Sequence, residues 1–518
     1  MNQAINLQND SFIKRYAIKV VTTIMGMLFS LILASVVPRS LGVVNYGDYS
    51  FLTNIFTQVL IFLDLRTSTC FYVKLSQEQK NTEIIKFYSL LSIFIIMAVL
   101  VGTWIITSNQ ILLDNLLPAQ QARFIYLAAI LAVMAFVQQQ LVKMMDSLGL
   151  TVLSEKINLF LILLSLLLVI VFYKFQTLDI SLYFYINIVT SLLFVVVAFF
   201  NLKKFSFSPT TDLAVIKKYA RIFYRYCAPL VVYVVIGFAS EYFDRWILQK
   251  YGGAVQQGFY AFAFGISNMS MFIVSSFFLL FTREVANLVG QNEIKAIGKL
   301  FDAYVPVLYV IVSFFSCFLF FQADNVINLL GGKDYLGASL VLKVLALLPL
   351  LSTFSMMSGS VIYATERTVI FRNIYFMLAP LGAIISAVLI SPLTAINLGA
   401  AGLAIKNISM EALSVIIILF LNSRYIKISF KKFFFHIIYV PVIFLVCAGA
   451  STYIVSSSMS IVKQSDALMN IITSGLIYSV VFMTVIYSYP KLIFKERHEI
   501  VNFVKTCIRK FQRRESTK

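Results

Sequence analysis

Three ionisable residues lie close together in one apolar stretch of the chain: Glu241, Asp244 and Arg245. Their spacing of three and four residues predicts that they share one face of a helix. Charged side chains within a membrane span are costly and are typical of ion or substrate pathways. Two interpretations stay open. Either the three line a polar cavity in which Arg245 binds an anion while the acids orient it or take a cation, or Glu241 neutralises Arg245 near the membrane interface.

Four more ionisable residues in or beside apolar stretches are candidates for substrate binding. Lys343 and Lys406 lie near the ends of their stretches, so each long side chain could instead extend to the membrane interface. Glu411 lies near the middle of its stretch and requires a facing cation or water. Lys19 lies one turn deeper than Arg15, and it either faces the mouth of a cavity or marks the basic side of the membrane.

No pattern for covalent catalysis is present in the sequence. The chain has no GxxxxGK[ST] nucleotide loop, no HExxH and no GxSxG. Its two histidines, His436 and His498, are isolated, and its five cysteines are scattered. The sequence therefore predicts no catalytic residue, no metal site, no disulfide framework and no cofactor. A coupling ion, Na⁺ or H⁺, is not identified by any residue pattern.

The composition predicts a membrane protein that must position these residues on helices. Of the 518 residues, 60% are hydrophobic and 13% are charged, whereas soluble domains carry roughly 25% charged residues. Unbroken apolar stretches of about 20 residues are long enough to cross a bilayer as helices. The expected fold is an all-α polytopic protein with about 14 transmembrane helices, and no cleavable signal peptide is expected.

The basic residues predict the orientation of the chain. The net charge is +19, but the lysines and arginines lie in short loops between apolar stretches, so nucleic acid is not an expected partner. They favour one face of the membrane by about five to one, which predicts that both termini are cytoplasmic. The loops on the other face are short and leave no room for an external domain.

A short pattern occurs twice and indicates a duplication. Residues Gly42–Tyr49 and Gly253–Tyr260 both read Gly, four residues, Gly, one residue, Tyr, with a shift of 211 residues. The same shift carries Lys14 onto Arg225, just before the first helix of each half. Two related halves are typical of transporters in which two bundles rock around a site between them. A chance match between turn glycines is the alternative.

The duplication and the apolar stretches suggest five parts of the chain. They are a six-helix bundle at 1–200, a cytoplasmic amphipathic linker at 201–226, a second six-helix bundle at 227–421, two additional transmembrane helices at 422–489 and a basic cytoplasmic tail at 490–518. In the linker, Ile216, Tyr219 and Phe223 recur at helical spacing among basic residues. This pattern predicts a helix lying on the anionic inner leaflet, among membrane lipids.

Several short motifs follow one another along the chain: Pro38-Arg39-Ser40-Leu41-Gly42, Tyr46-Gly47-x-Tyr49-Ser50-Phe51, Ala228-Pro229-Leu230, Asp244-Arg245, Gly258-Phe259-Tyr260, Gly331-Gly332-Lys333-Asp334-Tyr335 and Gly399-Ala400-Ala401-Gly402. In this order and spacing they resemble polysaccharide flippases of the Wzx type, which belong to the multidrug/oligosaccharidyl-lipid/polysaccharide exporter superfamily. One departure concerns the residues after Asp64, where the family often has Gly-Leu and this chain has Leu65-Arg66.

The resemblance implies two pseudo-symmetric six-helix bundles plus two extra helices, in the inner membrane of a bacterium. It implies that the protein flips undecaprenyl-pyrophosphate-linked oligosaccharide units to the outer leaflet by alternating access, for O-antigen or capsular polysaccharide. It also implies a polymerase and a chain-length regulator of the same pathway as partners. The alternatives are an ion-coupled drug or cation exporter of the same superfamily, and a membrane polysaccharide polymerase.

Overall fold

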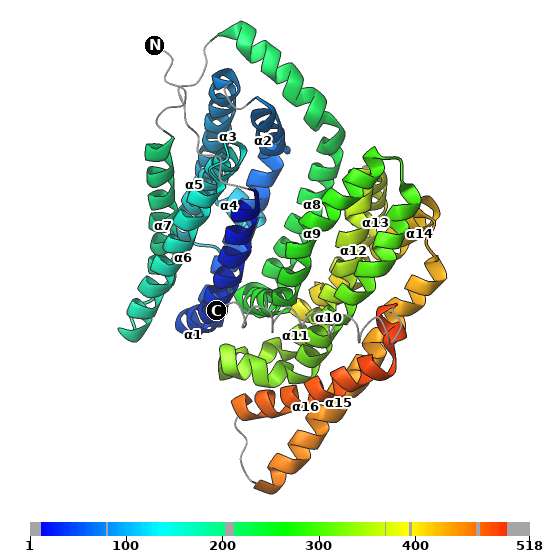
Figure 1. The fold of residues 1–518 in the computed structure, drawn as a ribbon. Helices are drawn as coiled ribbons and strands as arrows, with labels where there is room; N and C mark the ends of the chain where they lie inside the picture. The colour runs from blue at the N-terminus through cyan, green and yellow to red at the C-terminus, as the bar shows by residue number, and fades with distance from the viewer. Residues whose placement is uncertain are drawn as a thin grey trace, which may run out of the picture. The chain divides into compact units, whose positions relative to one another are not determined.

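The computed structural model describes residues 12–78, 81–202, 212–367, 369–392, 396–462 and 467–494. The described chain is helical and contains no strand (Figure 1). Its helices, in chain order, are α1 (Phe12–Asp64), α2 (Thr67–Gln77), α3 (Thr82–Ser108), α4 (Gln110–Leu116), α5 (Ala122–Ser147), α6 (Thr151–Lys174), α7 (Ile180–Asn201), α8 (Leu213–Ser267), α9 (Met271–Gly290), α10 (Ile294–Leu330), α11 (Ser339–Leu345), α12 (Leu348–Ala364), α13 (Val369–Ile390), α14 (Gly399–Ile426), α15 (Phe430–Val462) and α16 (Ala467–Ser488).

Two of these helices, α1 and α8, are each broken at a glycine. Gly42 has φ 73° and ψ 170°, and Gly253 has φ 67° and ψ −174°. Glycine adopts positive φ readily because it has no Cβ. A straight helix of 53 or 55 residues would be on the order of 80 Å long, far more than the ~30 Å hydrocarbon core. Each long helix is therefore two spans joined at its glycine.

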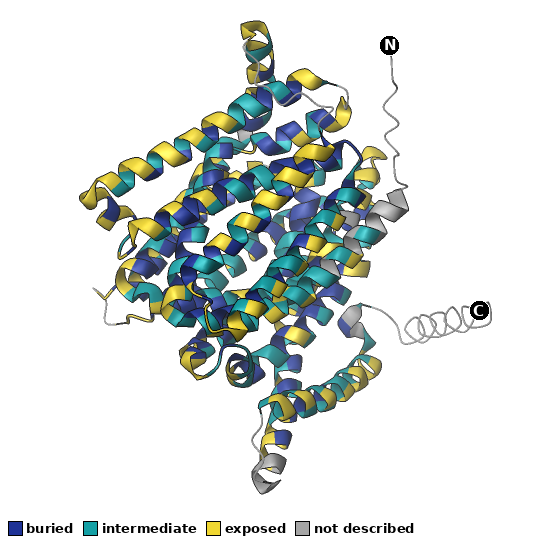
Figure 2. Cartoon of the chain, turned by 90° about the vertical axis from the view of Figure 1, so that its left-hand side faces the viewer, coloured by how far each residue is buried: buried dark blue, intermediate teal, exposed yellow. Residues whose placement is uncertain are grey.

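The number of spans agrees with the sequence-based expectation. Among the described residues, eleven helices are long and apolar enough to cross a membrane, and the bent pair α11–α12 makes a twelfth span. Division of α1 and α8 at their glycines adds one span each, which matches the fourteen expected. Large apolar side chains lie on the outside of these helices, such as Phe94 at 72% exposed and Trp104 at 61% (Figure 2). Such exposure suits contact with lipid rather than water.

The chain packs as two compact units. Unit 1 comprises Met1–Phe262 and Tyr375–Leu403, and unit 2 comprises Ala263–Ile374 and Ala404–Lys518. In unit 1, α1 packs on α5 and α6, and α5 packs on α3 and α7. In unit 2, α10 packs on α12, α15 and α16, and α9 packs on α12. The boundaries of these two packing units differ from the boundaries of the two repeats expected from the sequence. The two six-helix bundles therefore stay a prediction.

The described part of the linker is helical. From Leu213 onward it is the first part of α8, and it continues directly into the next span. Tyr219 and Phe223 are 3% and 4% exposed, and both rings pack against Phe87 of α3. Glu83 accepts a hydrogen bond from Lys218 at 3.1 Å, which raises the pKa of that lysine. These two apolar side chains therefore contact α3, and the place of the linker on the inner leaflet stays a prediction.

Candidate functional site

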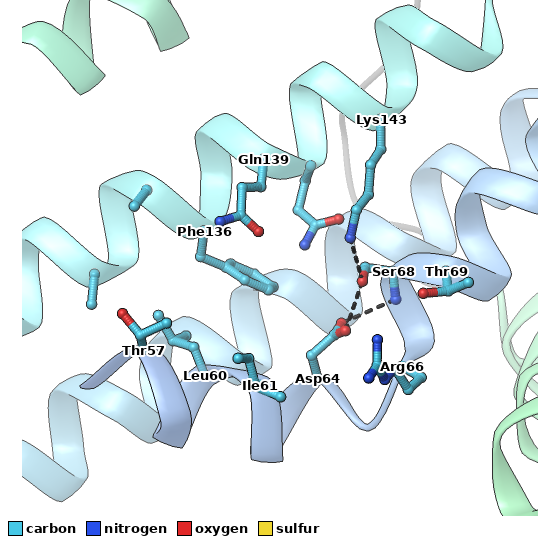
Figure 3. A pocket seen from close by; sticks show the side chains of 13 residues that line it. Thr57, Leu60, Ile61, Asp64, Arg66, Ser68, Thr69, Phe136, Gln139 and Lys143 are labelled. Atoms are coloured by element: carbon cyan, nitrogen blue, oxygen red, sulfur yellow. Dashed lines mark hydrogen bonds between the residues drawn. The ribbon is translucent and has the colours of Figure 1, made fainter. Parts of the chain in front are cut away.

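A polar cavity of about 270 Å³ lies in unit 1, between the end of α1, the start of α2 and the second half of α5 (Figure 3). We call it the Asp64 pocket. It is lined by Thr57, Leu60, Ile61, Asp64, Arg66, Ser68, Thr69, Ala132, Ala135, Phe136, Gln139, Gln140 and Lys143. Apolar side chains form its α1 wall and part of its α5 wall, and the ionisable groups gather at the bend between α1 and α2.

The carboxylate of Asp64 is held by hydroxyl and backbone donors. Asp64 is 7% exposed. Its Oδ1 accepts hydrogen bonds from the Thr67 hydroxyl at 2.8 Å, the Ser68 backbone N–H at 3.0 Å and the Tyr88 hydroxyl at 3.4 Å. Its Oδ2 accepts from the Ser68 hydroxyl at 2.7 Å. Both oxygens of this buried carboxyl group are thus satisfied by neutral donors.

Two cations share this pocket, and most of their donors remain unused. The Lys143 ammonium donates to the Ser68 hydroxyl at 2.7 Å, so it reaches Asp64 only through that hydroxyl (Figure 3). An ammonium has three N–H donors, and this is the one hydrogen bond of Lys143 within the described chain. The Arg66 side chain lines the same pocket, and Asp64 and, to a smaller extent, Arg66 act electrostatically on Lys143. In the described residues it makes no hydrogen bond or ion pair.

The bend that places Arg66 is built from two residues in unusual backbone conformations. Leu65 has φ 45° and Arg66 has φ 66°. Positive φ costs a non-glycine residue about 1–2 kcal/mol because its Cβ crowds the following carbonyl oxygen. A glycine would form the same bend without strain. This chain has arginine in the strained conformation, and its side chain lines the pocket.

We predict that Arg66→Gly is more stable than Arg66→Ala. Both variants remove the cation, but only glycine relieves the left-handed backbone, so its free energy of unfolding should exceed that of the alanine variant by about 1 kcal/mol. Thermal unfolding in detergent measures the difference. Equal unfolding temperatures for the two variants would show that the backbone at this position is not strained.

The arrangement suits a ligand with more than one negative charge. With Asp64 ionised, the pocket holds two positive charges and one negative charge, and the negative charge is already paired with neutral donors. Lysine and arginine both bind phosphate oxygens through charge-assisted hydrogen bonds. The amides of Gln139 and Gln140 line the α5 side of the pocket and can bond to hydroxyl groups. The site is therefore suited to a phosphate attached to a hydroxyl-rich group.

Elsewhere in unit 1, the two repeated segments, Gly42–Tyr49 in α1 and Gly253–Tyr260 in α8, contact each other reciprocally. A Cβ added to Gly47 would overlap the Ala254 carbonyl oxygen, and a Cβ added to Gly258 would overlap the Val43 carbonyl oxygen. The shift of 211 residues carries Val43 onto Ala254 and Gly47 onto Gly258. Each repeated segment thus presents its glycine to the same carbonyl of the other segment. Such reciprocity is what a two-fold axis between two related segments produces, and we call it the glycine contact.

Side-chain hydrogen bonds surround the glycine contact. Asp48 accepts from Gln120 at 2.7 Å and from Gln249 at 3.4 Å. The Tyr242 hydroxyl donates to the Leu116 carbonyl at 2.8 Å, and the Trp246 indole N–H donates to the Asn115 carbonyl at 2.6 Å. These bonds hold the first part of α8 against α1 and the end of α4, on the same side of unit 1 as the two glycine breaks.

The three residues expected to share a helix face all lie in the first part of α8, before its break at Gly253, but they differ in exposure. Asp244 and Arg245 are 5% and 7% exposed, whereas Glu241 is exposed. Asp244 accepts a hydrogen bond from the Ser386 hydroxyl of α13 at 2.6 Å. The Arg245 guanidinium donates to the side-chain oxygen Oε1 of Gln257 at 3.3 Å and lies 4.4 Å from the centre of the Tyr260 ring. Arg245 therefore contacts side chains of the second repeated segment, and its role in anion binding stays a prediction.

The other predicted residues lie in different places. Lys343 donates to Asp324 at 2.7 Å in unit 2, so its charge is paired. Lys406 is 8% exposed, and the place of its ammonium relative to the membrane interface stays a prediction. Glu411, on α14, is half-buried. The backbone of Lys19 lies in α1, but its side chain is outside the described residues.

Lys143 is the pocket residue that the sequence did not single out. Because it lies near the end of a span, it is expected simply as one of the basic residues that mark one face of the membrane. Its spacing from two glutamines could have indicated a polar site. Lys143 follows Gln139 and Gln140 by four and three residues, which puts all three on one face of α5. The structure pairs Asp64 with hydroxyl groups of α2.

Comparisons with known proteins show similarity in structure only. No protein-family model matches the sequence, and no curated protein sequence matches it significantly. The lipid II flippase MurJ, in an inward closed conformation, matches with a TM-score of 0.66 and 14% identity, over 93% of this chain and 100% of that one. An inward-facing multidrug resistance MATE transporter of the MOP superfamily matches with a TM-score of 0.62 and 14% identity, over 82% and 99%. A MOP superfamily transporter from Pyrococcus furiosus matches with a TM-score of 0.54 and 13% identity, over 82% and 98%.

These matches establish the fold. The chain shares the polytopic all-α fold of MOP superfamily transporters over most of its length, and it spans nearly the whole of each of the three structures. Lipid-linked flippases and multidrug exporters both have this fold, so the substrate must be argued from the residues of this chain.

Proposed function

We propose that the protein moves undecaprenyl-pyrophosphate-linked oligosaccharide units from the inner to the outer leaflet of a bacterial inner membrane, for O-antigen or capsular polysaccharide. The observation that carries this proposal is the Asp64 pocket. Lys143 and Arg66 supply unused N–H donors beside a carboxylate that is already paired. A pyrophosphate fits this charge pattern, and a cationic drug does not.

The transported head group explains why a polar cavity is needed. Each sugar hydroxyl that enters hydrocarbon without a hydrogen-bond partner costs several kcal/mol. A polar path through the protein removes this barrier, while the polyprenyl chain stays in lipid. Two related halves can then expose the path to each side in turn. Within unit 1, Asp244 and Arg245 are proposed to line the later part of this path.

The same proposal fixes the orientation. With both termini cytoplasmic, the Asp64 pocket lies at the inner face and the glycine contact lies at the outer face. A substrate synthesised on the cytoplasmic side would then meet Lys143 and Arg66 first. The proposal also includes a polymerase and a chain-length regulator that act on the exported units, and a coupling ion, Na⁺ or H⁺.

The orientation of the chain in the membrane can be tested at two equivalent positions of the repeat, which we predict to lie on the outer face. Val44 and Val255 are related by the shift of 211 residues and are 50% and 39% exposed. A cysteine at either position should react with an impermeant maleimide added to intact spheroplasts, in a chain whose own cysteines are replaced. Reaction of both positions only after permeabilisation would reverse the orientation and place the Asp64 pocket on the outer face.

The function is tested in proteoliposomes that hold undecaprenyl-pyrophosphate-linked N-acetylglucosamine with a fluorophore on the sugar. We expect the wild-type protein to expose the fluorophore to external dithionite from both leaflets, and Lys143→Gln to leave the inner pool protected. Ethidium uptake by the same vesicles tests the exporter alternative. Efficient ethidium transport without movement of the labelled lipid would contradict the proposal and favour a drug or cation exporter.

A further inference from the structure

A second cavity adjoins the Asp64 pocket and is almost wholly apolar. Its volume is about 240 Å³, and it lies between α2, α3 and α5. We call it the α3 cavity. It is lined by Phe71, Ile85, Tyr88, Ser89, Ser92, Ile93, Ile96, Phe136, Val137, Gln140, Leu141 and Met144. Phe136 and Gln140 line both cavities, so the polar and apolar spaces share a wall.

The shared wall contains a buried polar group that lacks a partner. Gln140 is 8% exposed, and its side-chain oxygen makes no hydrogen bond within the described part of the chain. A buried amide oxygen without a donor is uncommon in native proteins and indicates a ligand or a water that supplies one. Tyr88 also bridges the cavities, because its ring lines the α3 cavity while its hydroxyl donates to Asp64. The wall that the two cavities share therefore contains polar groups, and one of them lacks a hydrogen-bond partner within the described residues.

We propose that the two cavities together bind the junction between a pyrophosphate and a single isoprenoid chain. This inference rests on the proposed function and names the part of the substrate that the site holds. The pyrophosphate contacts Lys143 and Arg66, and the first isoprene units occupy the α3 cavity. The two volumes together fall within the roughly 300–1,000 Å³ range of small-molecule sites.

The shape of the site favours one chain over two. One cationic pocket is joined to one apolar cavity, so a lipid with a single chain fills both. A two-chain phospholipid would leave its second chain without a place in the site. The remainder of an isoprenoid chain can pass into the bilayer beside α3, because Ile93 lines the cavity and is 46% exposed, and Phe94 and Met97 next to it are 72% and 53% exposed.

Binding of three probes to the purified full-length protein tests the inference: farnesyl pyrophosphate, inorganic pyrophosphate and farnesol. We expect the wild type to bind farnesyl pyrophosphate at least tenfold more tightly than either other probe. Ser89→Phe fills the α3 cavity, and the Ser89 hydroxyl bonds only to the carbonyl of Ile85 in its own helix. This variant should lose the tenfold advantage while its pyrophosphate binding stays unchanged.

Two further variants guard against a folding defect. Ile96→Phe also fills the α3 cavity and keeps an apolar side chain, so it should behave like Ser89→Phe. Val101→Phe adds the same bulk to the same helix at a position that is 46% exposed and outside the cavity lining. It should bind all three probes as the wild type does.

Wild-type binding of farnesyl pyrophosphate by both Ser89→Phe and Ile96→Phe would overturn the inference. So would equal competition by phosphatidylglycerol, which would assign the site to a membrane phospholipid. Transport in vesicles separates this failure from failure of the proposed function. If the wild type moves the labelled lipid and Ser89→Phe moves it equally well, only the inference fails. If the probes bind as expected but the wild type moves no lipid, the proposed function fails and the site remains.

Discussion

Gly47→Ala and Gly258→Ala should each abolish transport while leaving the protein in the membrane at its normal level. A methyl group at either position would overlap a backbone carbonyl oxygen of the other repeated segment. The obstructing oxygen belongs to Ala254 for Gly47 and to Val43 for Gly258. Overpacking typically costs 1–3 kcal/mol even where side chains can move, and here the obstructing atoms are backbone. A cost of about 3 kcal/mol shifts a two-state equilibrium by more than a hundredfold. The conformation with the glycine contact would be nearly unpopulated.

Accessibility of Gln249 measures this shift directly. Gln249 is 2% exposed and lies beside the glycine contact, where it donates to Asp48. A cysteine at Gln249, in a chain whose own cysteines are replaced, should react slowly with external maleimide in the wild type and quickly in Gly47→Ala. Gly102→Ala is the matched control, because a Cβ at Gly102 meets no atom within 4 Å. Protected cysteine and normal transport in both Gly47→Ala and Gly258→Ala would show that the contact does not open during transport.

The glycine breaks could be predicted from sequence because their cause is local. A glycine at equivalent places in two copies of a pattern indicates a backbone that needs positive φ. Gly42 and Gly253 have this conformation, and both long helices break there. The number of spans was predictable for a similar reason, since it depends on apolar length alone. Neither property requires knowledge of which helix contacts which.

The Asp64 pocket could not be predicted because it depends on long-range packing and on strain. Ser68 and Lys143 are 75 residues apart in the chain, and their hydrogen bond exists only because α2 packs on α5. The left-handed backbone of Leu65 and Arg66 contradicts the preference of both residue types, so local preference alone predicts another bend. A similar limit applies to Lys343, whose partner Asp324 lies across a turn between two helices.

Removal of the Lys143 charge should reduce transport at least tenfold. Lys143→Gln keeps a donor of similar reach for the Ser68 hydroxyl but cannot hold a phosphate by charge. A hydrogen bond to a charged group contributes about 1.5–3 kcal/mol, which corresponds to roughly 10–150-fold in binding. Lys143→Arg should retain part of the activity, since arginine also binds phosphate. Ser68→Ala breaks the link to Asp64 but keeps both charges, so its effect on transport should be smaller than that of Lys143→Gln.

The double variant Asp64→Asn, Lys143→Gln separates substrate binding from simple charge balance. If Lys143 serves only to offset the buried Asp64, removing both charges together should restore transport, because no unpaired buried charge would remain. If Lys143 binds the pyrophosphate, the double variant should be as inactive as Lys143→Gln alone. Protein levels in the membrane and thermal unfolding establish that each variant is folded. Restored transport in the double variant would remove Lys143 from the substrate site and leave Arg66 as the remaining cation of the Asp64 pocket.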